Sequence, residues 1–170
     1  TIILKRNDPT QAAKQVSLTE LGSIKLNKEE RNKMLKTIPR SSVIGFLIGV
    51  LPGAGATIAS FLAYGMERNF VSDEEKQKFG KGSVHGLAAP ETANNAACSG
   101  AFVPLLTLGI PGSGTTAVML GALLGFGIQP GPRLYITNPE IFWSVIMSMY
   151  IGMVILLILN LPLIPYIARI

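Results

Sequence analysis

Hydrophobic positions along the chain gather into three long runs that contain no charged residue. The runs cover residues 41–66, 92–132 and 141–168. At about 1.5 Å per residue, each run is long enough as a helix to cross a hydrocarbon core of about 30 Å. An apolar helix in the core of a soluble protein seldom exceeds about 14 such residues. The pattern therefore predicts an all-α integral membrane fold.

Two of the three runs are interrupted near their middle. The first contains "LPGAGA" and the second contains "LGIPGSGTT". Proline removes a backbone donor and glycine weakens a helix, so neither stretch favours a continuous helix. We expect residues 41–66 to form a broken helix and residues 92–132 a broken helix pair, either re-entrant or discontinuous. Residues 141–159 are the cleanest transmembrane helix.

The segments between these runs are polar. Residues 1–40 are expected to form a cytoplasmic linker with a short juxtamembrane helix, which a capping box of Asn27 and Glu30 begins and Pro39 ends. Residues 67–91 are expected to form an aqueous loop. That loop is periplasmic if residues 41–66 cross the membrane completely and cytoplasmic if they re-enter.

Composition and charge narrow the function. Only 15% of the 170 residues are charged, against about 25% in a typical soluble domain. The net charge of +5 falls within residues 1–40, which contain no aromatic residue. A basic flank beside apolar spans fits the positive-inside pattern and not a nucleic-acid surface. The chain begins with Thr1, and we expect it to be part of a longer protein.

The polar chemistry of an enzyme is missing from the sequence. Cys98 is the one cysteine, so no internal disulfide forms, and its small apolar neighbours predict a buried thiol. The single histidine, His85, lacks the spacing of a metal site, and no nucleophile–base pair is evident. We expect no enzyme activity, no metal and no cofactor.

The two interruptions share the pattern P-G-x-G. We call residues 52–57 (PGAGAT) the first tip and residues 111–116 (PGSGTT) the second tip. The stretch "GIPGSGTT" (residues 109–116), which ends with the second tip, has the G-x-x-x-x-G spacing of a phosphate-binding loop but lacks its lysine. Paired breaks in hydrophobic segments point to a transporter's binding site, because irregular backbone in a membrane is tolerated only where it is buried or lines a cavity.

The start of a helix after each tip suits an anion. It offers free N–H groups and the positive end of the helix dipole, and glycines let a carboxylate approach the backbone. The candidate substrate-binding residues of the tips are Pro52, Gly53, Ala54, Gly55, Thr57, Pro111, Gly112, Ser113, Gly114, Thr115 and Thr116. The alternative is a kinked structural helix with glycines for close packing, a role we assign to the G-x-x-x-G pairs Gly45/Gly49 and Gly121/Gly125.

A second constellation is "AAPETANNAACSG" at residues 88–100. Pro90 is expected to start a helix, with Glu91 near its positive end and the amides of Asn94 and Asn95 one turn further. Asn94 and Asn95 are candidate substrate-binding residues, and Glu91 is the candidate for ion coupling. The alternative is that all three side chains cap the helix and face water at the interface.

These motifs together carry a resemblance to a known family. The stretches "RSSVIGFLIGVLPGAGATIASFLAYGMER", "FGKGSVHGLAAPETANNAACSGAFVPLLTLGIPGSGTTAVMLGALLGFGIQPGPRL" and "NLPL" resemble the large membrane subunit of the tripartite tricarboxylate transporter family. The resemblance covers roughly residues 40–165 and places the chain at the opening of the second of two related halves. Two residues depart from the family's pattern: His85 stands where an acidic residue is expected, and Cys98 where Ala or Gly is usual.

The resemblance implies a secondary carboxylate importer in a bacterial inner membrane, crossing it several times. It implies a small four-helix membrane subunit and a periplasmic substrate-binding protein as partners, and Na⁺ or H⁺ as the coupling ion. The motifs do not distinguish one carboxylate from another. The alternative function is a channel or structural membrane protein that uses broken helices without coupled transport.

Overall fold

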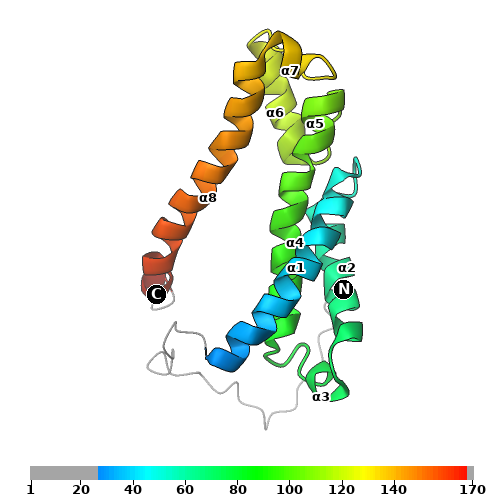
Figure 1. The fold of residues 1–170 in the computed structure, drawn as a ribbon, viewed down its shortest axis with the longest axis vertical. Helices are drawn as coiled ribbons and strands as arrows, with labels where there is room; N and C mark the ends of the chain where they lie inside the picture. Colours follow the sequence, from blue (N-terminus) through cyan, green and yellow to red (C-terminus); the bar gives the residue numbers. More distant parts are fainter. Residues whose placement is uncertain (1–26, 168–170) are drawn as a thin grey trace, which may run out of the picture. The chain divides into compact units, whose positions relative to one another are not determined.

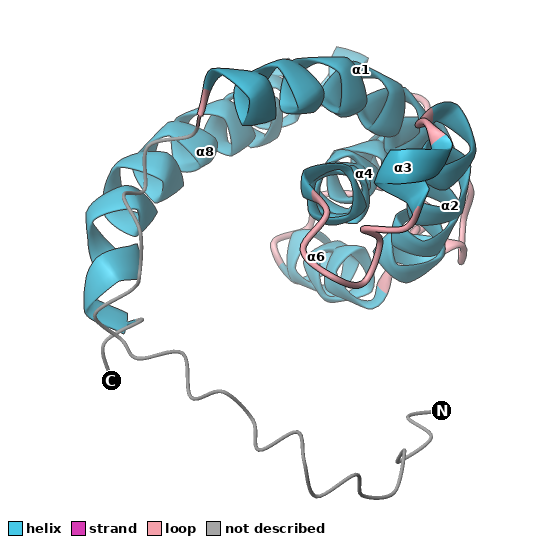
Figure 2. Cartoon of the chain, turned by 90° about the horizontal axis from the view of Figure 1, so that it is seen from below, coloured by secondary structure: helices cyan, strands magenta, loops and turns pink. Residues whose placement is uncertain are grey.

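The structure, a computed structural model, describes residues 27–167, and these residues form helices and no strand (Figure 2). The linker expected at residues 1–26 lies outside the described residues. Residues 27–151 fall within one compact unit, and the contacts reported below lie within it. The all-α prediction is confirmed for the described residues. The helices are α1 (Lys28–Val50), α2 (Gly55–Phe70), α3 (Asp73–Lys76), α4 (Val84–Gly100), α5 (Phe102–Leu108), α6 (Gly114–Gly125), α7 (Leu134–Thr137) and α8 (Pro139–Ile167).

Helix α1 is longer than the sequence predicted. It starts after Asn27, whose backbone N–H donates to Glu30 Oε2 at 2.8 Å, as the expected capping box requires. It then continues through Pro39 to Val50, so the prediction that Pro39 ends a short helix is wrong. Proline removes one backbone hydrogen bond, but Thr37 and Ser41 on either side are buried. Packing along this face outweighs the lost bond, while Pro39 itself lies on the exposed side.

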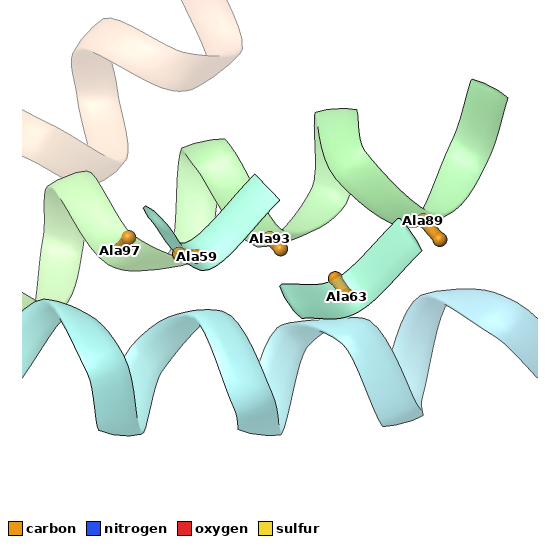
Figure 3. Close-up of a cluster of buried hydrophobic side chains, with 5 residues drawn as sticks. All are labelled: Ala59, Ala63, Ala89, Ala93 and Ala97. Carbon is orange, nitrogen blue, oxygen red and sulfur yellow. The ribbon is translucent and has the colours of Figure 1, made fainter. Parts of the chain in front are cut away.

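Helices α1, α2 and α4 pack side by side and form the core (Figure 1). The contact between α2 and α4 is made of small side chains, which lie between the two ribbons in Figure 3. Small residues allow helix backbones to approach closely, as is typical of helix pairs in membranes. The buried cluster consists of Ala59, Ala63, Ala89, Ala93 and Ala97.

Two glycines of α1 bring its backbone against α4. A Cβ atom on Gly45 would overlap the carbonyl oxygen of Ala93, and one on Gly49 would overlap that of Ala97. The predicted packing role of this G-x-x-x-G pair is therefore confirmed. For Gly121 and Gly125 no atom of the described residues lies within 4 Å of such a Cβ, so their packing role stays a prediction.

Helix α4 begins earlier than the sequence predicted. Its N-cap is Ser83, whose hydroxyl accepts the Gly86 N–H at 3.1 Å, and Pro90 lies in the helix interior. The prediction that Pro90 starts a helix is thus wrong, and α4 occupies the end of the predicted 67–91 loop. The Pro90 carbonyl accepts the Ser60 hydroxyl of α2 at 3.1 Å, and this packing holds the helix continuous across the proline. Glu91 is consequently not at a helix N-terminus.

Helix α8 carries the longest apolar stretch of the described residues. Its segment Pro139–Ile164 has a mean hydropathy of 2.4 and is long and apolar enough to cross a membrane, judged by length and composition. The predicted transmembrane helix at residues 141–159 lies within it. The shorter apolar helix α6, with 12 residues, follows the second tip.

Candidate functional site

The first tip separates α1 from α2. Helix α1 ends at Val50 and α2 begins at Gly55. Gly53 and Gly55 have φ angles of 84° and 68°, a left-handed backbone that residues with a Cβ seldom adopt. No side chain caps α2. Among the described residues, its first amides, those of Gly55, Ala56 and Thr57, therefore have no acceptor.

The second tip separates α5 from α6. Ser113 is the N-cap of α6: its backbone N–H donates to Thr116 Oγ1 at 2.8 Å, and its hydroxyl accepts the Thr116 N–H at 3.3 Å. This capping box leaves the amides of Gly114 and Thr115 without an acceptor in the described part of the chain. The structure thus gives the hydroxyls of Ser113 and Thr116 a role in capping the helix. Their donation to a ligand stays a prediction.

The structure brings the two tips into contact. The Gly53 N–H donates to the Gly112 carbonyl at 3.3 Å. Gly112 is buried against the end of α4, where a Cβ on it would lie 3.1 Å from the Cβ of Ala101. A backbone hydrogen bond therefore joins the two irregular segments from which α2 and α6 begin.

A hollow of about 520 Å³ lies between α2 and α4. It brings together two of the predicted site residues, Thr57 and Asn94, and adds two that sequence reasoning missed, Ser60 and Tyr64. A signal for them exists in the sequence: residues 57, 60, 61 and 64 have the i, i+3, i+4, i+7 spacing of one helix face. The remaining lining residues are Phe61, Gly86 and Pro90.

Two other predicted site residues of α4, Glu91 and Asn95, are not among the lining residues of this hollow. Asn95 Nδ2 donates to the backbone carbonyl of Glu91 at 2.8 Å, so its amide is bound to its own helix. Glu91 is exposed, as is Cys98, and the prediction of a buried thiol is wrong. Cys98 lies one turn after Asn94, and its Sγ is 3.8 Å from the Asn94 Oδ1.

A buried polar cluster at the other end of α2 was missed entirely. We call Thr37, Arg40, Glu67 and His85 the Glu67 cluster. Glu67 is 2% exposed and accepts from Arg40 Nη2 at 2.6 Å and from Thr37 Oγ1 at 2.8 Å. His85 Nδ1 lies 3.0 Å from Glu67 Oε1 and 2.7 Å from Thr37 Oγ1. Glu67 follows Ala59 and Ala63 at four-residue intervals, and this spacing places it on their buried face.

Comparison with known proteins points to one family. A model of the tripartite tricarboxylate transporter TctA family matches residues 2–170. The chain is 41% identical over 159 residues to an uncharacterized 52.8 kDa protein in the TAR-I ttuC' 3' region of Agrobacterium vitis, covering 94% of this chain and 31% of that protein. It is 49% identical over 120 residues to an uncharacterized protein in the TAR-II ttuC' 3' region of the same organism, covering 71% of this chain and 49% of that protein.

These matches cover only part of each relative. The chain spans 31% of the length of the first relative and 49% of the second. No solved structure matches the chain.

Proposed function

We propose, since this chain belongs to the tripartite tricarboxylate transporter TctA family, that its two joined tips form the carboxylate site of a secondary importer. The family is a transporter family and not an enzyme family, as the sequence indicated. The observation that carries the proposal is the hydrogen bond from the Gly53 N–H to the Gly112 carbonyl, which unites the tips. In the bilayer, the segments around the tips would be discontinuous or re-entrant helices.

The chemistry of the joined tips supports an anionic substrate. Five amides at the starts of α2 and α6 have no acceptor among the described residues. A helix N-terminus stabilises a nearby anion by about 0.3–1 kcal/mol, and by up to about 2 kcal/mol where it is partly buried. Two such termini beside one carboxylate-bearing solute reinforce each other, and hydrogen bonds from amides to a carboxylate are strong. A charged side chain in the membrane, which is costly, is therefore not required for binding.

The transporter that we propose is a larger assembly in a bacterial inner membrane. It would contain a small four-helix membrane subunit, and a periplasmic binding protein would deliver the solute. An ion gradient of Na⁺ or H⁺ would drive uptake. Glu91, which is exposed on α4, remains the ion-coupling candidate that the sequence offers.

Uptake by the complete assembly tests this function. Inverted and right-side-out vesicles that contain both membrane subunits are prepared. Radiolabelled citrate, or one of a panel of radiolabelled dicarboxylates, is added outside the vesicles. We expect accumulation only in right-side-out vesicles that receive the binding protein, and its loss when ionophores collapse the ion gradients. Passage of the solutes down their gradient without the binding protein would instead identify a channel.

Two neighbouring asparagines provide a matched pair of variants. Asn94 lines the hollow with Thr57, whereas the Asn95 amide is bound to the Glu91 carbonyl of its own helix. Asn94→Ala is therefore expected to raise the concentration for half-maximal uptake by at least about tenfold, the effect of losing a hydrogen bond of about 1.5–3 kcal/mol to a charged group. Asn95→Ala should change it by less than about twofold. Equal effects of the two substitutions would show that the hollow lined by Thr57 and Asn94 is not part of the carboxylate site.

A further inference from the structure

The Glu67 cluster contains a buried acid held by three side chains from two other helices. Arg40 and Thr37 reach Glu67 Oε1 from α1, and His85 reaches it from α4. The side chain of Glu67 is 2% exposed and that of His85 is 9% exposed. A buried carboxylate is costly unless it is paired, so this arrangement keeps an ionised acid stable inside the helix packing.

Counting hydrogens fixes the state of one nitrogen of His85. Glu67 Oε1 is an acceptor, and it lies 3.0 Å from His85 Nδ1. With Glu67 ionised, we assign the hydrogen to Nδ1, which donates it, because two acceptors at this distance would repel each other. Thr37 Oγ1 has a single hydrogen, for which Glu67 Oε1 at 2.8 Å and the Lys33 carbonyl at 3.0 Å compete. Within residues 27–167, the hydrogen bonds of the ring all use Nδ1, and Nε2 is the nitrogen that can gain a second proton.

A polar hollow of about 490 Å³ reaches His85. The charged groups that face it are Glu29, Lys33, Lys36 and Arg40 from α1 and Glu75 from α3. The Lys78 ammonium, which donates to Glu75 at 2.7 Å, and the nearby Lys33 lower the pKa of the Glu75 carboxyl. The hollow is therefore lined by charged residues of both signs, and His85 is among its lining residues.

We propose that His85, with Glu67 as its counter-charge, is a proton-binding site of the transporter and that the coupling ion is H⁺. The inference rests on the proposed transport function. A proton from water adds to Nε2 and leaves an imidazolium, and the same proton returns to water on release. Because the imidazolium adds a positive charge beside Glu67, proton binding strengthens the contact between His85 of α4 and Glu67 of α2. Helix α4 carries Asn94, and α2 starts at the first tip. The Arg40 guanidinium, whose Nη2 donates to Glu67 Oε1, already supplies a positive charge at this carboxylate, so a proton on His85 and not a metal cation is the ion that we assign to the site.

Proton binding can be measured directly on the complete membrane complex. The complex is labelled with ¹⁵N-histidine, and the His85 ring resonances are assigned by their absence in His85→Gln. Histidine is the side chain that ordinarily changes charge between pH 5 and 8. We expect the Nε2 resonance to convert reversibly from the neutral to the cationic position as the sample is acidified. A ring that keeps one protonation state from pH 5 to 8 would overturn the proposal. If His85→Gln does not fold, the change that Glu67→Gln causes in the same resonance gives the assignment.

Uptake of radiolabelled citrate then tests the coupling role. Wild-type uptake is expected to change at least threefold between pH 5.5 and 7.5, and His85→Gln and Glu67→Gln should flatten this profile. The matched control is Glu74→Gln on α3, an exposed acid, which should keep the wild-type profile. A wild-type profile in His85→Gln would refute the role in coupling. If the wild type takes up no citrate at any pH, the proposed function fails for citrate, whereas the resonance still decides whether His85 binds a proton.

Discussion

Gly45→Ala is expected to prevent stable packing of α1 on α4, although it adds only one methyl group. The new Cβ would lie 2.6 Å from the Ala93 Cα and would overlap the Ala93 carbonyl oxygen. Backbone atoms cannot turn aside as a flexible side chain can, so the two helices must separate. Overpacking of this kind ordinarily costs about 1–3 kcal/mol and sometimes more. Because the buried alanines of α4 share this contact, we expect a value at the upper end.

Thermal unfolding of the complete subunit in detergent measures the effect, with the yield of monodisperse protein as a second readout. The matched control is Gly65→Ala in α2, where no described atom lies within 4 Å of the added Cβ. That substitution should leave stability unchanged or raise it slightly, since alanine favours a helix more than glycine does. Equal melting temperatures for the two variants would show that α1 and α4 are not packed as described.

The sequence predicted the helices whose boundaries depend on local chemistry. Long uncharged runs indicated helices, and the capping box at Asn27 set the start of α1. Helix α1 ends at Val50 and α2 begins at Gly55, where Gly53 and Gly55 have left-handed backbones that act within a few residues, whereas the start of α6 is set by the Ser113 cap. The packing role of Gly45 and Gly49 could likewise be predicted from the sequence, since small residues at this spacing lie on one helix face.

Features that depend on contacts between distant residues were not predictable. Pro39 and Pro90 lie inside helices because neighbouring residues pack against other helices, and no local pattern reports that packing. Glu67 was assigned to an aqueous loop because it is charged. Its partners Arg40 and His85 lie 27 and 18 residues away, so only the tertiary structure brings them together.

Gly114→Val is expected to abolish high-affinity carboxylate uptake while leaving the fold intact. Gly114 is the first residue of α6, and a Cβ there meets no described atom within 4 Å. The added side chain would instead occupy the space beside the amides of Gly114 and Thr115, where the carboxylate would sit. Loss of two charge-assisted hydrogen bonds, at about 1.5–3 kcal/mol each, predicts at least a hundredfold weaker half-saturation.

The matched control is Gly65→Val in α2, a position that is equally open among the described residues. It adds the same side chain to a helical glycine away from both tips, and it should keep wild-type uptake. Gly112→Val would be a poor test of binding, because its side chain would press against Ala101 and disturb the fold itself. Normal half-saturation in Gly114→Val would exclude the second tip from the site.

Hydrogen–deuterium exchange can detect a carboxylate held by the backbone amides of the two tips. The complete complex is incubated with the carboxylate that gives the highest uptake, and exchange is followed in peptides that cover residues 51–58 and 110–118. If the amides at the starts of α2 and α6 hold the carboxylate, both peptides should exchange more slowly when it is bound, and Gly114→Val should remove this protection. Bound carboxylate with unchanged exchange at both tips would contradict the account.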